Sequence, residues 1–359
     1  DDENILGEGG FSKVYLARNE REGTEQALKI LKKEYEGDDR VVASFFRDPG
    51  VMMSLDHPNI IRIFDVGSPG ESPFYHSMEY CAGGDLKNIL QRRGRLPITT
   101  VLHHAITLCG ALAYCHGRGI FHRDIKASNI LYRDADTPVL SDFGTEVAGL
   151  ELIATRQCNV GSPPYLSPEV WESRSYDARS DLYSFGVLLY FAVTGRLPFV
   201  GGTLAEYRTL HRTKAPLPPS TWTPTVARDL DTVILALLEK NANDRISSAH
   251  DLGEQLARIR GRFYSGQGAH FTTRLVLSAP PHERRGITVH RFPCRIGKFE
   301  ATSGDQHNDL IIGSDDPHVS RFHAVIEKID ESYLFTDVSS NGTIVNGVKI
   351  HKQSVELLK

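Results

Sequence analysis

The chain has 359 residues, of which 40% are hydrophobic and 24% are charged, and its formal net charge is −4. This length exceeds one ordinary domain, so we expect two domains, or a two-lobed domain with an added module. The charge balance gives no support to nucleic acid as a partner, and we expect none. The most apolar run, Leu182 to Val193, is too short to span a bilayer and is interpreted as a buried helix.

The five cysteines are odd in number and show no C-x-x-C spacing. This favours reduced thiols in a cytoplasmic protein over structural disulfides or a metal site. No signal peptide is visible, so we expect a cytoplasmic location and leave open a membrane anchor outside this sequence.

Residues 5 to about 80 alternate short apolar runs with glycines and charges, which predicts a small antiparallel sheet with one helical stretch. From Leu86 onward apolar residues recur three or four positions apart, which predicts helices over 98–116, 181–194, 226–238 and 248–259. The sequence becomes glycine-rich at 260–271 and then resumes a strand pattern. We therefore predict a domain boundary there and an all-β sandwich after it.

The first motif is a glycine-rich strand–turn–strand whose backbone amides could close over phosphates. It contains Leu6, Gly7, Gly9 and Val14, with Ser12 where a third glycine would stand. By itself the pattern fits an ordinary hairpin equally well. A following strand ends in Ala27-Leu28-Lys29, where a lysine can reach the α- and β-phosphates, and this favours a nucleotide site.

The second motif runs from His122 to Asn129 (HRDIKASN) and is followed by Asp142-Phe143-Gly144. Phosphoryl transfer requires mainly positioning and charge neutralisation from a protein. The two stretches together supply a proton acceptor, a cation and two oxygen ligands for a metal, so they predict this chemistry.

With these motifs, residues 1 to about 260 resemble the protein kinase superfamily. Two further segments carry the resemblance, HSMEYCAGGD at 76–85 as the hinge and GSPPYLSPE at 161–169 as the end of the activation loop. The resemblance implies an α+β bilobal kinase fold, ATP, and Mg²⁺ with Mn²⁺ as the alternative ion. It places an N-lobe at about 1–77, a hinge at 78–84 and a C-lobe at 85–262.

The resemblance also implies a role for each site residue. Asp124 would accept the substrate hydroxyl proton, Lys126 would neutralise the γ-phosphate and Lys29 would orient the nucleotide. Asn129 and Asp142 would hold the metal. The residues implied in nucleotide binding are Leu6, Gly7, Gly9, Val14, Ala27, Lys29, Met78, Glu79, Cys81, Asn129 and Asp142.

Other residues would act through structure or regulation. The resemblance implies that Asp181 braces the catalytic loop and that Arg245 pairs with Glu169. Lysine at 126 is the Ser/Thr pattern. Arg123 directly before Asp124 implies that activation-loop phosphorylation matters, because a guanidinium can hold a phosphate. Thr155 is the first candidate phosphosite and Thr145 is the second.

Asp48 stands where the resemblance places the carboxylate partner of Lys29, and Pro49 follows it directly. A residue before proline is pushed away from helical angles, whereas Asp-Pro makes a good N-cap and first helical position. We therefore predict a helix that begins or breaks near Asp48, which leaves open whether the Lys29–Asp48 pair forms.

The C-terminal segment carries RIGK at 295–298, SRFH at 320–323 and SSNGTIVNG at 339–347. In this order they resemble the forkhead-associated (FHA) domain, a β-sandwich that binds phosphothreonine peptides, here expected over 272–359 after a linker at 263–271. The resemblance assigns phosphopeptide binding to Lys298, Ser320, Arg321, Ser340 and Asn341, and loop support to His323. Lysine replaces the family's arginine at 298, which predicts weaker or less selective binding. We expect the sandwich to be incomplete at residue 359, because its final strands are missing.

The sequence thus indicates a bacterial-type Ser/Thr protein kinase fused to an FHA domain. Its expected partners are Ser/Thr-containing proteins and phosphothreonine peptides, with dimerisation or trans-autophosphorylation as a further option. One alternative is a pseudokinase scaffold, motivated by Asp48, Ser12 and Lys298. The other is a small-molecule phosphotransferase, which should lack GSPPYLSPE.

Overall fold

A computed structural model describes most of the N-terminal 266 residues and the strands that follow them. The described residues are 4–67, 72–134, 136–143, 163–173, 175–266, 273–279, 283–289, 294–297, 310–311, 324–329, 332–337, 343–345, 348–351 and 354–357. Contacts divide the chain into two compact units, residues 1–260 and 261–359, which are described separately.

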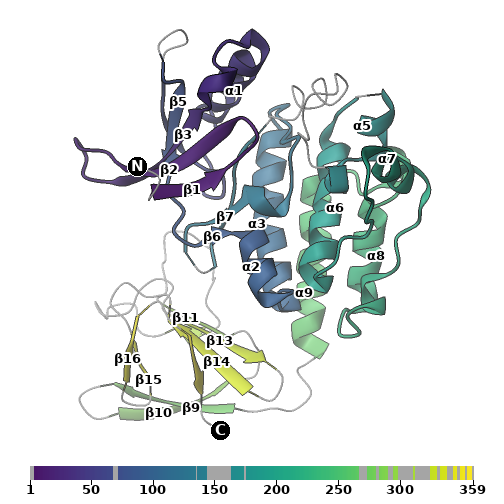
Figure 1. The fold of residues 1–359 in the computed structure, drawn as a ribbon. Coiled ribbons are helices and arrows are strands. Elements are labelled where there is room, and N and C mark those ends of the chain that lie inside the picture. Colours follow the sequence, from purple (N-terminus) through teal and green to yellow (C-terminus); the bar gives the residue numbers. More distant parts are fainter. Residues whose placement is uncertain are drawn as a thin grey trace. The chain divides into compact units, whose positions relative to one another are not determined.

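The first unit begins with a five-stranded antiparallel sheet in the order β1-β2-β3-β5-β4 (Figure 1). The strands are β1 (Ile5–Glu8), β2 (Ser12–Arg18), β3 (Glu25–Leu31), β4 (Ile63–Val66) and β5 (Tyr75–Glu79). One helix, α1 (Asp39–Met52), packs against this sheet through a buried cluster of Leu31, Val41, Phe45 and Phe74. The predicted small sheet with one helical stretch is therefore confirmed.

The start of α1 differs from the prediction. Its N-cap is Asp38, whose carboxylate accepts hydrogen bonds from the backbone N–H groups of Arg40 (3.0 Å) and Val41 (3.4 Å). From there α1 runs without a break past Asp48 to Met52. The prediction of a helix start or break near Asp48 was wrong.

Packing explains why α1 passes through Pro49. A proline inside a helix lacks one N–H and costs about 3 kcal/mol. The side chains of Val41, Phe45, Pro49 and Met52 recur three or four positions apart, and all four are buried. Most helix stability in proteins comes from burial of such a face, so the packing on both sides of Pro49 outweighs the local preference.

The rest of the first unit is mainly helical. Its helices are α2 (Leu86–Arg93), α3 (Ile98–His116), α5 (Pro168–Ser173), α6 (Ala178–Thr194), α7 (Leu204–Thr213), α8 (Arg228–Leu237) and α9 (Ala249–Gly266). A small sheet, β6 (Gly84–Asp85), β7 (Ile130–Tyr132) and β8 (Pro138–Leu140), lies at its junction with the strand-rich lobe. The four predicted helices are all present, and the run from Leu182 to Val193 is the interior of α6, as expected.

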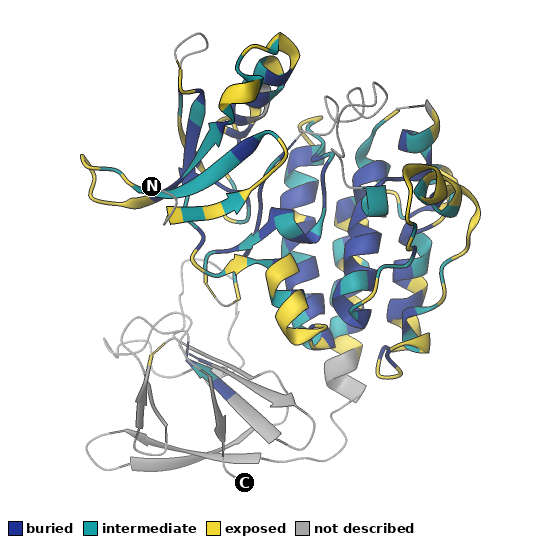
Figure 2. Ribbon diagram, in the orientation of Figure 1, coloured by how far each residue is buried: buried dark blue, intermediate teal, exposed yellow. Residues whose placement is uncertain are grey.

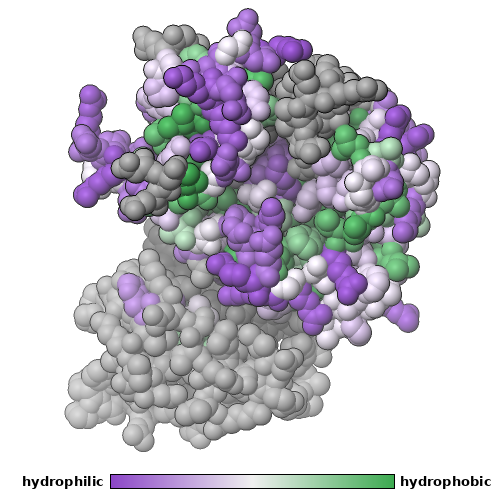
Figure 3. Space-filling model, in the orientation of Figure 1, coloured by the Kyte–Doolittle hydropathy of each residue, from purple (hydrophilic) through white to green (hydrophobic). Residues whose placement is uncertain are grey.

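Burial shows how this lobe is organised. In Figure 2, α6 is dark blue along most of its length, whereas α7 carries many exposed residues. Among the described residues, α3 alone has the length and hydropathy of a membrane span, but its buried face lies in the lobe core. On the visible face of the first unit, apolar side chains form separate small patches among hydrophilic ones (Figure 3).

The structure describes three cysteine side chains in this unit. Cys81, Cys109 and Cys115 are free thiols and are buried. Burial raises the pKa of Cys81 and of Cys115 to about 12 and also raises the pKa of Cys109.

After the end of α9 at Gly266, the described part of the second unit is all-β, as predicted. Five strands pair in the order β12-β11-β13-β14-β17, and β9–β10 and β15–β16 form two antiparallel ribbons. The strands are β9 (Thr273–Ala279), β10 (Glu283–Val289), β11 (Cys294–Gly297), β12 (Leu310–Ile311), β13 (Ala324–Ile329), β14 (Ser332–Asp337), β15 (Thr343–Val345), β16 (Val348–Ile350) and β17 (Ser354–Leu357).

The predicted linker at 263–271 begins too early, because α9 continues to Gly266. The glycine-rich composition suggested a loop, but a glycine such as Gly261 costs a helix only about 1 kcal/mol relative to alanine. Extending an existing helix is far easier than starting one, so α9 passes this position.

Candidate active site

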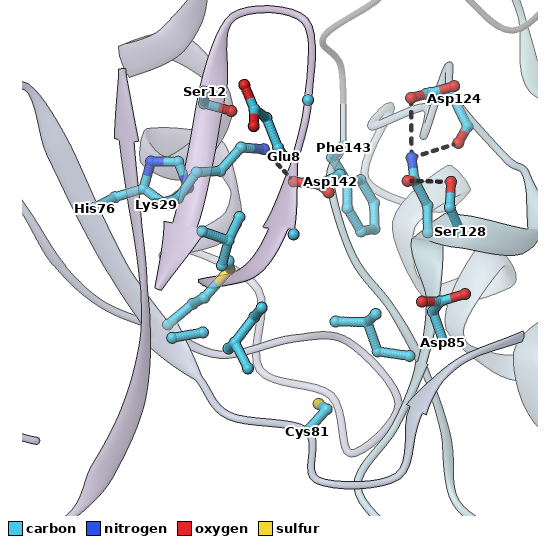
Figure 4. A pocket seen from close by; sticks show the side chains of 18 of the residues that line it. Glu8, Ser12, Lys29, His76, Cys81, Asp85, Asp124, Ser128, Asp142 and Phe143 are labelled. Atoms are coloured by element: carbon cyan, nitrogen blue, oxygen red, sulfur yellow. Dashed lines mark hydrogen bonds and ion pairs between the residues drawn. The ribbon is translucent and has the colours of Figure 1, made fainter. Parts of the chain in front are cut away.

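One cavity of about 750 Å³ lies between the sheet and the helical lobe of the first unit. It is lined by every residue that the sequence analysis assigned to the nucleotide, the metal or catalysis: Leu6, Gly7, Gly9, Val14, Ala27, Lys29, Met78, Glu79, Cys81, Asp124, Lys126, Asn129 and Asp142. Segments more than 100 positions apart in the sequence therefore meet at a single site (Figure 4).

The glycine-rich motif forms the hairpin between β1 and β2. Gly9 closes the turn by donating its N–H to the carbonyl of Ser12 (2.8 Å). The Glu8 carboxylate lies 2.7 Å from the Lys32 ammonium at the end of β3. The turn is thus tied to the sheet and lines the cavity with its backbone.

The first two residues of the predicted hinge, 78–84, are still part of strand β5. Met78 and Glu79 belong to β5, where Met78 pairs with Ala27 and Glu79 pairs with Gln26 of β3. The N–H of Glu79 also donates to the carbonyl of Arg62 (2.9 Å). These bonds extend the strand by two residues into the predicted 78–84 hinge, and they fix the edge of the cavity.

Lys29 lies opposite Asp142 in the cavity, with its Nζ 2.5 Å from Oδ1 of Asp142 (Figure 4). Burial alone would raise the pKa of Asp142, but the charge and hydrogen bond of Lys29 lower it to about 2. Asp142 is therefore an anion near neutral pH. The side chain of Asp48 lies outside the described residues, and so does the predicted Lys29–Asp48 pair.

The sequence analysis did not single out His76, which lies on β5 directly opposite Lys29. Its imidazole is buried and lines the cavity beside the ring of Phe45. Burial and the nearby Lys29 charge lower the pKa of His76 to about 3, so this ring is neutral. The sequence could have indicated that His76 faces the cavity, because it precedes Met78 by two positions and residues two apart lie on one face of a strand.

A second cluster is centred on Asp124, which is buried. The Lys126 ammonium lies 2.5 Å from Oδ2 of Asp124. The Asn129 amide donates to both the backbone carbonyl and Oδ2 of Asp124, each at 2.9 Å. These contacts fix the carboxylate of Asp124 at the cavity wall.

The donor set fits a magnesium ion that is shared with a nucleotide. Mg²⁺ takes oxygen ligands, usually one or two from the protein and the rest from phosphates and water. The Asp142 carboxylate and the Asn129 amide oxygen supply two such ligands. No group of three or more acidic, histidine or cysteine ligands is found within the described part of the chain.

Asp181 holds the loop that leads to Asp124. Its buried carboxylate accepts from the backbone N–H groups of His122 (2.8 Å) and Arg123 (2.9 Å). It also contacts the Tyr176 hydroxyl (2.5 Å) and Nε2 of His116 (2.8 Å), two partners that no motif indicated. Arg123 has a left-handed backbone, with φ of 68°. Such a conformation costs of order 1–3 kcal/mol, and the bonds to Asp181 stabilise it.

Phe143 completes the link between the two clusters. Its ring is buried and stacks on His122, with ring centroids 4.4 Å apart. The preceding residue, Asp142, has a φ of 54°. This turn directs the Asp142 carboxylate to Lys29 while the next side chain packs on His122.

Glu169 and Arg245 form the expected pair. Both terminal nitrogens of Arg245 donate to the Glu169 carboxylate at 2.8 Å, and the Arg245 side chain is fully buried. The guanidinium also donates to the backbone carbonyls of Arg179 (3.0 Å), Glu239 (2.8 Å) and Lys240 (3.2 Å). Burial would raise the pKa of Glu169, but the bonds from Arg245 lower it to about 2.

Several predicted residues lie outside the described residues. They are the phosphosite candidates Thr145 and Thr155, and the phosphopeptide-site residues Lys298, Ser320, Arg321, His323, Ser340 and Asn341.

Comparisons with known proteins agree with this geometry. Residues 1–256 match the model of the protein kinase domain, and residues 294–359 match the FHA domain. The serine/threonine-protein kinase PknB of Mycobacterium leprae is 34% identical over 270 residues, which cover 74% of this chain and 43% of that protein. The serine/threonine-protein kinase pkn3 of Myxococcus xanthus is 35% identical over 268 residues, 72% of this chain and 49% of that protein.

A probable serine/threonine-protein kinase of Clostridium acetobutylicum is 33% identical over 262 residues, 73% of this chain and 40% of that protein. The chain thus spans less than half the length of these curated relatives. Together, the motif order, the cavity and the match over residues 1–256 show that the chain belongs to the protein kinase family and carries an FHA domain at its C-terminal end.

Proposed function

We propose that the chain is a Ser/Thr protein kinase that transfers the γ-phosphate of ATP to protein hydroxyls. The observation that carries this proposal is the convergence of Lys29, Asp124, Lys126, Asn129 and Asp142 on one cavity. The family implies ATP and a divalent metal, and we propose that the metal is Mg²⁺.

Each of these residues has a distinct task in the proposed reaction. When bound, the metal would neutralise charge on the phosphate oxygens, and Asn129 and Asp142 would hold it. Lys29 orients the nucleotide phosphates. Asp124 accepts the proton of the attacking hydroxyl at its carboxylate. Lys126, whose ammonium is next to that carboxylate, neutralises the transferring phosphate.

We propose that phosphorylation is also an input. Arg123 precedes the catalytic aspartate, and among the described residues its Nε is buried without a hydrogen-bond partner. A buried donor of this kind favours a ligand such as a phosphate. Thr155 is our first candidate for the phosphorylated residue and Thr145 is the second.

The FHA domain, over about 272–359, would bind phosphothreonine made by the same chain, by a second copy or on a substrate. Covalent linkage of the two domains raises their effective concentration for one another. We place this reaction in the cytoplasm, with Ser/Thr-containing proteins as substrates.

Incubation with Mg²⁺ and ATP, followed by phosphosite mapping by mass spectrometry, tests the kinase proposal. We expect phosphate on serine and threonine, with Thr155 as the first site, and none in the Asp124→Asn variant. Absence of protein-bound phosphate in the unmodified chain would refute it and would favour a scaffold role.

Binding of matched peptides tests the FHA proposal. A phosphothreonine peptide should bind the full chain, whereas its unphosphorylated form should not. We expect Arg321→Ala to weaken this binding roughly tenfold or more, because a charge-assisted contact contributes about 1.5–3 kcal/mol. Lys328→Ala, a charge removal within β13, is the matched control. Equal affinity in Arg321→Ala and the control would contradict the assignment.

A further inference from the structure

The segment from Glu79, the last residue of β5, to Gly83 is attached at both ends to residues 132 and 133 of the helical lobe. At its first end, the Glu79 carboxylate receives two hydrogen bonds from Arg133, from Nε to Oε1 and from a terminal nitrogen to Oε2 (2.9 Å for the second). At its other end, the N–H of Gly83 donates to the carbonyl of Tyr132 (2.8 Å).

The second attachment is close-packed. A Cβ added to Gly83 would lie 2.6 Å from the Asp134 carbonyl oxygen and 2.6 Å from Cβ of Tyr132. No side chain fits there, so the backbone of Gly83 lies directly on residues 132–134. Residues 79–82, which line the cavity, therefore have little freedom to move away from this turn.

Arg133 reaches a third segment, the connection between α1 and β4. One of its terminal nitrogens donates to the carbonyl of Pro58. The neighbouring Asn59 is bonded to the same lobe through its amide, which donates to the Pro138 carbonyl (2.9 Å), and through its carbonyl, which accepts from the N–H of Leu140 (2.9 Å). A single guanidinium thus joins the segment after β5 to the connection between α1 and β4.

The turn that follows Arg133 is itself stabilised by hydrogen bonds. The Asp134 carboxylate accepts from the backbone N–H groups of Asp136 and Thr137, each at 2.9 Å, and from the Thr137 hydroxyl (3.0 Å). The Arg133 and Glu79 side chains are 30% and 22% exposed, so solvent only partly screens the pair. Because this turn holds the planar guanidinium of Arg133, its two donors fix the Glu79 carboxylate in one defined position.

We propose that Arg133 is a positioning residue for the nucleotide. By holding Glu79 and the Pro58 segment, Arg133 fixes the backbone of residues 79–81 in the geometry that meets the adenine edge. Pre-ordered backbone lowers the ordering cost that binding must otherwise overcome. This inference rests on the proposed nucleotide site.

The test compares Arg133→Met, which keeps most of the aliphatic stem and removes the fork, with Arg212→Met. Arg212 pairs with Glu172 (2.6 Å) and does not line the cavity, so it is the matched control. The readouts are the Kd of a non-hydrolysable ATP analogue with Mg²⁺, hydrogen exchange of the amides at 79–84, and KM and kcat for ATP.

We expect Arg133→Met to raise the Kd and the KM for ATP roughly fivefold or more, the size typical of residues coupled in one network. Exchange at 79–84 should accelerate, kcat should stay within about twofold, and Arg212→Met should change none of these values. Arg133→Lys should restore only part of the affinity, because a lysine is a point charge. A lower melting temperature without a change in Kd or exchange would show that Arg133 is structural only.

Glu79→Gln provides a second route if Arg133→Met does not fold. Glutamine keeps the shape and removes the charge, so it should reproduce the rise in Kd, and the double variant should add little further loss. Unchanged affinity in Glu79→Gln would also overturn the inference. Analogue binding and exchange need no catalysis, so these readouts hold even where the unmodified chain transfers no phosphate.

Discussion

Asparagine in place of Asp124 is expected to lower the rate of phosphoryl transfer about a thousandfold, within the 10²–10⁴ range of general-base catalysis. An amide cannot take up the hydroxyl proton, yet it has the size of the carboxylate. The pocket should persist, because Asp181 holds the loop through the backbone of His122 and Arg123. Initial rates with labelled ATP give the loss, and calorimetry with an ATP analogue should show retained nucleotide binding.

Asp65→Asn is the matched control for this change. Asp65 is an exposed carboxylate that accepts a hydrogen bond from the Tyr75 hydroxyl (2.9 Å), and it does not line the cavity. The phosphoryl-transfer rate of the Asp65→Asn variant should equal that of the unmodified chain. An unchanged rate in Asp124→Asn would place the proton acceptor elsewhere. Loss of nucleotide binding would instead mean that Asp124 mainly holds Lys126 and Asn129 in place.

Methionine in place of Arg245 is expected to destabilise the first unit by about 3–5 kcal/mol, the usual cost of removing one partner from a buried ion pair. It removes the charged donor from the Glu169 carboxylate, which keeps the hydrogen bond from the Ser180 hydroxyl (2.6 Å), and it removes one donor from each of three backbone carbonyls. For a unit of this size the melting temperature should fall by roughly 10 °C. Thermal unfolding followed by circular dichroism measures the change.

The effect of Arg245 should also depend on pH. The pKa of Glu169 is about 2 in the folded chain against 4.5 for the free group, so its pairing stabilises the fold above pH 4.5. This contribution is lost as the pH falls from 4.5 toward 2. The stability gap between the unmodified chain and Arg245→Met should therefore narrow below pH 4.5. Arg212→Met, in an exposed pair, should cost less than about 1 kcal/mol. A similarly small loss in Arg245→Met would contradict the prediction.

Periodic and local signals in the sequence predicted most of the fold. The spacing of apolar residues gave α3 its observed bounds, Ile98–His116. The predicted start of α6 was three residues late. Its N-cap is Asp177, which bonds the Arg179 N–H (2.8 Å) and precedes the apolar run. The start of α1 was missed for the opposite reason, because a strong local signal at Asp48-Pro49 was outweighed by packing along the whole helix.

Motifs also predicted the residues of the cavity, since the motif residues line the same cavity. They could not predict pairs that only the fold brings together. Glu79 and Arg133 are 54 positions apart and His116 and Asp181 are 65 apart, with no spacing rule for either pair. Whether two such side chains meet depends on how β5, β7, α3 and α6 pack.

The three buried thiols make the chain a reporter of its own local opening. A cysteine reacts as the thiolate, and burial with a pKa of about 12 leaves Cys81 and Cys115 almost inert in the closed structure. A thiol reagent therefore modifies each one only when its surroundings open. Cys81 would report the opening of the segment after β5, and Cys109 and Cys115 would report that of α3. The labelling rates would separate the flexibility of this edge of the cavity from that of the helical core, with the chain's own cysteines as the labelled groups.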